Sequence, residues 1–168
     1  VDSFEFGCRS AAITHGDAVA YLSAGLLSQL ITDIILSNKP VIEVVEALAE
    51  KIIQKRNDAK SAVEDEGYAE CLEAMTIAYD YLNKYSDHPA DILDLIGNVA
   101  GPKLFTTKVV LSQSLYVAMA ASRNDWSADH ALKFAVTQSG DSDSVAAITG
   151  GMLGVMGGKQ SEFSQDLK

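Results

Sequence analysis

Hydrophobic positions recur every three to four residues along most of the chain, and the strict alternation typical of strands is hard to find. This spacing predicts an all-α fold. The longest apolar stretch, residues 17–36, is hydrophobic around most of its circumference, so we expect it to be the central helix. A second helix is predicted after Pro40, because a proline in the first turn of a helix loses no internal hydrogen bond.

Turn residues divide the rest of the chain into further helices. The charged, weakly periodic residues 54–66 are interpreted as a loop, whose acidic end suits the positive N-terminus of the next helix. Ser127 is predicted to be an N-cap. The other expected helices cover residues 4–12, 66–84, 91–95, 107–121, 127–136 and 145–154. No linker is long enough to divide the chain, which predicts one helical unit.

Composition and charge narrow the class of protein. With 168 residues, of which 48% are hydrophobic, the chain can bury a core of its own. Its net charge of -10 argues against non-specific binding to nucleic acid or to an anionic membrane. The weakly polar run 145–158 is shorter than the roughly 18–20 residues of a membrane span, and no signal peptide opens the chain, so we expect a cytoplasmic protein. Cys8 and Cys71 lie too far apart for a zinc motif or a disulfide framework.

Residues 138–144 carry the most informative chemistry. Asp141, Asp143 and Ser144 offer two carboxylates and a hydroxyl at a junction between a loop and a small-residue helix. Such hard oxygen ligands suit Mg²⁺ or Ca²⁺, although the segment lacks the further ligands of an EF-hand. The spacing leaves a second interpretation open, in which Asp141 is an N-cap and Asp143 is favoured by the helix dipole.

Two segments resemble one known family. Gly140-Asp-Ser-Asp-Ser144, followed by Val-Ala-Ala-Ile-Thr-Gly-Gly-Met-Leu-Gly154, is similar to the closing motif of the ADP-ribosylglycohydrolases. Residues 6–25, with Thr14-His15-Gly16 at their centre, resemble the first helix and Thr-His loop that precede the central helix of that family. The order and separation of the two segments also fit. The resemblance covers essentially the whole chain and is weakest between residues 40 and 100.

The resemblance implies a fold, a reaction and a set of site residues. The expected fold is a compact orthogonal helical bundle with a binuclear Mg²⁺ site, with Mn²⁺ as an alternative ion. Asp141, Asp143 and Ser144 would be metal ligands, with Asp143 bridging the two ions, and His15 would contact ADP-ribose. The implied activity is magnesium-dependent hydrolysis of the N- or O-glycosidic bond that joins ADP-ribose to a modified protein or small molecule.

Part of the family pattern is missing from this sequence. The Ser/Thr-Asp-Asp triplet that supplies the other metal ligands does not occur, nor does the glycine-rich loop that precedes the first helix. Residues 1–168 are therefore expected to be the C-terminal half of a single all-helical domain. The N-terminal half would be the partner and would carry the unknown general acid/base, so this chain alone is expected to be inactive. An exposed apolar patch on residues 17–36 would mark the surface that this partner covers.

Other departures and alternatives are also relevant. Asp17-Ala18 replace a His and a Pro that often follow Thr-His-Gly, Phe105 and Lys108 replace a segment containing Trp and Glu, and Ser139 replaces a second Gly. One alternative function is a catalytically silent structural or ADP-ribose-binding relative of the crystallin type. Another is a helical bundle whose motif only caps a helix. His88 and His130 have no motif context and are interpreted as surface or capping groups.

Overall fold

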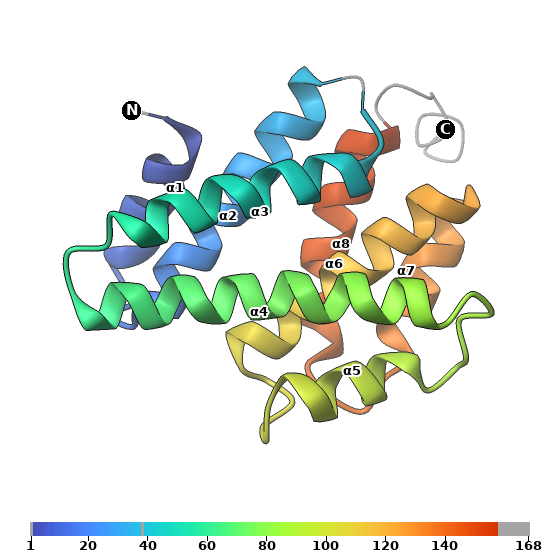
Figure 1. The fold of residues 1–168 in the computed structure, drawn as a ribbon. Coiled ribbons are helices and arrows are strands. Elements are labelled where there is room, and N and C mark those ends of the chain that lie inside the picture. Colours follow the sequence, from blue (N-terminus) through green and yellow to red (C-terminus); the bar gives the residue numbers. More distant parts are fainter. Residues whose placement is uncertain (1, 38, 158–168) are drawn as a thin grey trace.

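The computed structural model describes residues 2–37 and 39–157, and these residues form eight α-helices and no strand (Figure 1). The all-α prediction is confirmed. In chain order the helices are α1 (Ser3–Ala12), α2 (Ala18–Leu36), α3 (Val41–Asn57), α4 (Ala62–Lys84), α5 (Ile92–Ala100), α6 (Thr107–Asn124), α7 (Ala128–Val136) and α8 (Ser142–Gly157).

The central helix is α6, so the prediction that residues 17–36 would be central was wrong. Every residue of α6 from Val109 to Ala121 is buried, and the helix packs against α2, α3, α4, α5, α7 and α8. The sequence disguises this role, because the buried stretch includes Ser112, Gln113 and Ser114. Their side chains donate hydrogen bonds to the backbone carbonyls of Lys108, Leu93 and Val145, which offsets the cost of burying polar groups.

Helix α2 is apolar on all sides but only partly enclosed. It packs against α1, α3, α4, α6 and α8, yet only 33% of its most apolar 18-residue window is buried. By length and composition alone it is apolar enough to cross a membrane, as the core helix of a soluble protein can also be. Its contacts with five other helices indicate a helix packed into this fold, and only its last two residues, Ile35 and Leu36, are exposed.

The prediction of a loop over residues 54–66 was also wrong, because most of those residues are helical. α3 continues to Asn57 and α4 begins at Ala62, after the N-cap Ser61, whose side chain accepts the Glu64 N–H. Arg56 closes the short turn with two hydrogen bonds to Asp65, at 2.8 and 3.2 Å. The charges that suggested a loop therefore join two long antiparallel helices, which lie side by side in Figure 1.

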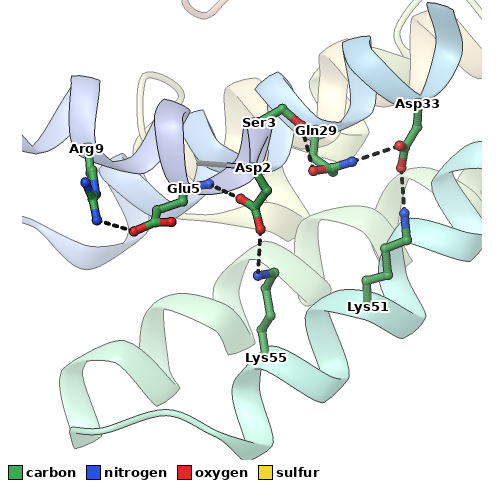
Figure 2. Close-up of polar contacts among 8 residues, drawn as sticks. All are labelled: Asp2, Ser3, Glu5, Arg9, Gln29, Asp33, Lys51 and Lys55. Carbon is green, nitrogen blue, oxygen red and sulfur yellow. Dashed lines mark hydrogen bonds and ion pairs between the residues drawn. The ribbon is translucent and has the colours of Figure 1, made fainter. Parts of the chain in front are cut away.

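Helix α1 is held on α2 and α3 by a close backbone approach and a polar network. Cβ atoms added to Gly7 and Gly25 would lie 2.6 Å from the Ala24 carbonyl oxygen and 2.3 Å from the Cys8 Sγ, so only glycine fits at this crossing. Figure 2 shows the network. It links Asp2, Ser3, Gln29, Asp33, Lys51 and Lys55 across the three helices, and Glu5 pairs with Arg9 within α1.

His88 is not a surface or capping group, as the sequence suggested. It is half-buried between α4 and α5, with a positive φ of 47°. Its Nδ1 lies 2.6 Å from the hydroxyl of the fully buried Tyr116, and its Nε2 lies 2.8 Å from Asn124 Nδ2. His130 is exposed, as expected, and its N–H donates to the N-cap Ser127, which confirms that cap.

Candidate functional site

Residues 137–141 form the turn that leads into α8, and residues 142–144 form the first turn of that helix. The Val145 N–H donates to the Asp141 carbonyl at 3.1 Å, which makes Asp141 the residue that precedes the first helical turn. Asp141 and Ser144 are partly buried, whereas Asp143 is exposed. The three predicted ligands therefore lie together at one end of one helix.

The two carboxylates lie within hydrogen-bonding reach of each other. The side-chain hydrogen bond with Asp141 is the main cause that lowers the pKa of Asp143 below its ordinary value. The backbone N–H groups of Asp143 and Ser144, at the N-terminus of α8, also favour the ionised carboxylate. Neighbouring carboxylates of this kind are a common arrangement for binding a divalent cation.

Beside these side chains lies a groove of about 300 Å³, formed by helices far apart in the sequence. Asp141 and Ser144 supply its polar end. The walls are mainly apolar and come from α2, α6, α8 and the turn before α6: Ser23, Ala24, Leu27, Phe105, Thr107, Val110, Leu111 and Ile148. The Phe105 side chain is 69% exposed, and it leaves an aromatic face open to a ligand.

His15 is not brought into this groove. It lies in the exposed turn between α1 and α2, and it is absent from the residues that line the groove. Its Nδ1 is 2.8 Å from the Thr14 hydroxyl, and its N–H donates to the Ala11 carbonyl at 2.9 Å. These contacts are local, so the structure gives His15 no shared site with Asp141.

The donor set fits magnesium chemically but is small. Among the described residues, no three His, Cys, Asp or Glu side chains gather closely enough to hold a metal ion. Asp141, Asp143 and Ser144 therefore contribute two carboxylates and one hydroxyl. Mg²⁺ usually takes one or two carboxylates from a protein and completes its shell with water and substrate oxygens. One ion suits this set, and a pair of ions requires ligands from elsewhere.

The walls of the groove could not be predicted from the sequence. Ser23, Ala24 and Leu27 belong to the helix that was expected to be central, and Val110 and Leu111 have the spacing of ordinary core residues. Phe105 was noticed only as a departure from the family pattern. Lys108, the other departure noted there, forms an ion pair with Glu73 of α4 at 2.9 Å and does not line the groove.

A second hollow, of about 360 Å³, lies between α1, α2 and α3 and includes Lys51 and Lys55. Lys51 pairs with Asp33 at 2.9 Å, and Lys55 lies 4.0 Å from Asp2 (Figure 2). Lys55 also lies above the ring of Phe4. Because both cations already have partners, this hollow is a poorer candidate for an anionic ligand than the groove beside Asp141.

Comparison with known proteins supports the resemblance seen in the motifs. The family model for ADP-ribosylglycohydrolase matches residues 2–165 and so includes both the Thr-His turn and the start of α8. No curated protein and no solved structure matches the chain. The match extends over nearly all 168 residues, and it agrees with the all-helical fold. The chain belongs to the ADP-ribosylglycohydrolase family.

Proposed function

We propose that this chain supplies the C-terminal metal ligands of a magnesium-dependent ADP-ribosylglycohydrolase. The enzyme would hydrolyse the N- or O-glycosidic bond between ADP-ribose and a protein or small molecule. The observation that carries the proposal is the placement of Asp141 and Ser144 at the polar end of a groove with apolar walls, with Asp143 within hydrogen-bonding reach of Asp141.

Each residue has a distinct expected role. Asp141 and Asp143 would bind the ion through carboxylate oxygens, with Asp143 shared between two ions, and Ser144 would add its hydroxyl. When bound, magnesium supplies Lewis-acid stabilisation and fixes the ribose hydroxyls. The apolar walls at Leu27 and Ile148 would exclude water beside the sugar. We assign no general acid or base to the described residues.

A helical partner is part of the proposal, because the donor set is too small for two ions. The C-terminal end of α2 supports it: Ile35 and Leu36, the last two residues of this mainly apolar helix, are 54% and 79% exposed. A helix of this kind is normally enclosed by other elements. The proposed partner is the N-terminal half of the same enzyme, which would cover this end of the helix and bring the remaining ligands and the general acid/base.

The first test measures ADP-ribose binding by calorimetry, with and without Mg²⁺ or Mn²⁺, in the wild type and in Asp143→Ala. We expect binding that depends on the metal and that weakens at least tenfold in the variant. Asp129→Ala is the matched control, because Asp129 is also exposed in the first turn of a helix. Two outcomes would contradict a ligand role: equal losses of ADP-ribose affinity in both variants, or a loss of stability in Asp143→Ala without a change in metal dependence. Asp143 would then only stabilise the N-terminus of its helix.

The second candidate function is a catalytically silent relative that binds ADP-ribose or serves a structural role. The absence of any three-ligand cluster among the described residues favours it. Release of ADP-ribose from a modified arginine or serine peptide separates the two, measured with every polypeptide in the sample identified by intact mass. Metal-dependent turnover when a second fragment is present supports the enzyme. Binding with no turnover, even with that fragment, supports the silent relative.

A further inference from the structure

Helix α5 contacts the turn that precedes the proposed ligands. Asp94, in the first turn of α5, accepts two hydrogen bonds on its Oδ1 atom: one from the Ser139 N–H at 2.9 Å and one from the Ser139 hydroxyl at 2.7 Å. Ser139 lies 45 residues further along the chain and two residues before Asp141. Both polar groups of Ser139 are thus fixed by one carboxylate from another helix.

A second attachment lies beside the first. The fully buried Gln113 of α6 donates from Nε2 to the Leu93 carbonyl at 2.8 Å and to Gln138 Oε1 at 3.3 Å. The same Gln138 oxygen accepts the Gly140 N–H at 2.8 Å. Adjacent residues of α5 therefore hold two successive residues of the turn: Leu93 holds Gln138 through Gln113, and Asp94 holds Ser139 directly.

These contacts leave the turn little freedom. A Cβ atom on Gly140 would lie 2.8 Å from Leu104 Cβ and 2.9 Å from the Leu104 carbonyl oxygen, so the backbone is pressed against that residue. The carbonyl of Gly140 accepts the Ser142 N–H at 3.0 Å, and α8 begins there. Any shift of Ser139 would therefore move Asp141 and Asp143.

We propose that Asp94 is a positioning residue, which orients the Asp141-Asp143-Ser144 segment for metal binding by holding Ser139. The inference rests on the proposed function, which makes those three residues ligands. Asp94 acts on the turn and not on the ion, because no third acidic side chain joins Asp141 and Asp143 among the described residues. Residues that orient metal ligands commonly change metal affinity by about 10- to 100-fold when they are removed.

A competing role for Asp94 is electrostatic, because an acidic residue in the first turn stabilises a helix whatever it touches. Three variants separate the two roles. Asp94→Ala removes both the charge and the acceptor, whereas Asp94→Asn removes the charge and keeps an Oδ1 acceptor. Asp91→Ala is the matched control: Asp91 is the exposed N-cap of the same helix, and its side chain makes no capping hydrogen bond.

The experiment measures amide hydrogen exchange at Ser139 and Gly140 by NMR, and the dissociation constant for Mn²⁺, in the full chain. We expect Asp94→Ala to speed exchange at Ser139 at least tenfold and to weaken Mn²⁺ binding about tenfold. Asp94→Asn and Asp91→Ala should stay within about twofold of the wild type. Thermal melts check that all three variants remain folded at the measuring temperature.

Two results would overturn the positioning role. One is that Asp94→Ala leaves the rate of amide exchange at Ser139 unchanged from the wild type. The other is that Asp94→Asn speeds this exchange and weakens Mn²⁺ binding as much as Asp94→Ala does. Failure of the proposed function has a different signature, in which wild-type Mn²⁺ binding is absent or does not depend on Asp143. Hydrogen exchange still decides in that case whether Asp94 orders the turn.

Discussion

The two segments that carry the family motif are supported in different ways. Residues 138–144 are tied to α5 and α6 by side-chain hydrogen bonds and packed against Leu104. The turn around His15 has only local hydrogen bonds, mainly to the Ala11 carbonyl. An added Cβ atom on Gly16 would meet nothing within 4 Å, whereas one on Gly140 would collide with Leu104.

This contrast shows which part of the proposed site is preorganised. The metal-ligand turn is fixed by residues of this chain before any ion binds, which reduces the cost of ordering it on binding. The turn at His15 has no such support from the described residues outside its own neighbourhood. We therefore expect metal affinity to depend on the fold of this chain, and contacts of His15 with ADP-ribose to depend on the partner or the ligand itself.

The two turns should differ most in their response to an added methyl group, which Gly140→Ala and Gly16→Ala each introduce. We expect Gly140→Ala to destabilise the chain by about 1–3 kcal/mol, because the new Cβ has no room beside Leu104. Gly16→Ala should be neutral or should stabilise by about 0.4–1 kcal/mol, because no described glycine has a positive φ and the space is open. Urea unfolding measures both. Equal effects at the two sites would show that the turns are equally constrained.

His88 differs from His15, because its ring is held by side chains from other parts of the fold. Burial is the main cause that lowers the pKa of His88 below its ordinary value of 6.5. The unfolded chain therefore binds a proton at a higher pH than the folded chain. Stability from this group is complete above about pH 6.5 and is lost as the pH falls from there through the lower folded pKa.

The measurement is the melting temperature between pH 8 and pH 5 in the wild type and in His88→Gln. We expect the variant to be less stable at pH 8 by about 1–3 kcal/mol, because Tyr116 loses its buried partner, and to lose less stability as the pH falls. Parallel curves for the two proteins would contradict the lowered pKa.

The smallest expected effect on stability is that of His15→Ala. The side chain is exposed and its one side-chain hydrogen bond is to the adjacent Thr14, so the free energy of unfolding should change by less than about 0.5 kcal/mol. If His15 contacts the ligand, ADP-ribose affinity should still fall several-fold in calorimetry. A large loss of stability with unchanged affinity would make His15 structural.

Much of the fold and of the ligand set was predictable from local pattern. The 3.6-residue period predicted the helices, and Ser127 caps α7 as expected, because periodicity and capping depend on residues close in sequence. The motif at 140–144 pointed to the turn before α8, where the structure gathers Asp141, Asp143 and Ser144. The loop at 54–66 was misjudged because its charges pair across the turn, as Arg56 does with Asp65.

Local sequence patterns were enough to predict the helical class, the family and the residues that could bind a metal. The central position of α6, the groove that Leu27 and Phe105 line together with Asp141, and the contact of Asp94 with the turn became visible only in the folded chain. The physical reason is that periodicity and motifs follow from neighbouring residues, whereas burial and hydrogen-bond partners depend on residues brought together by folding. Gln113 is the clearest case, because it is a polar residue that is fully buried in α6, where its Nε2 donates to the Leu93 carbonyl.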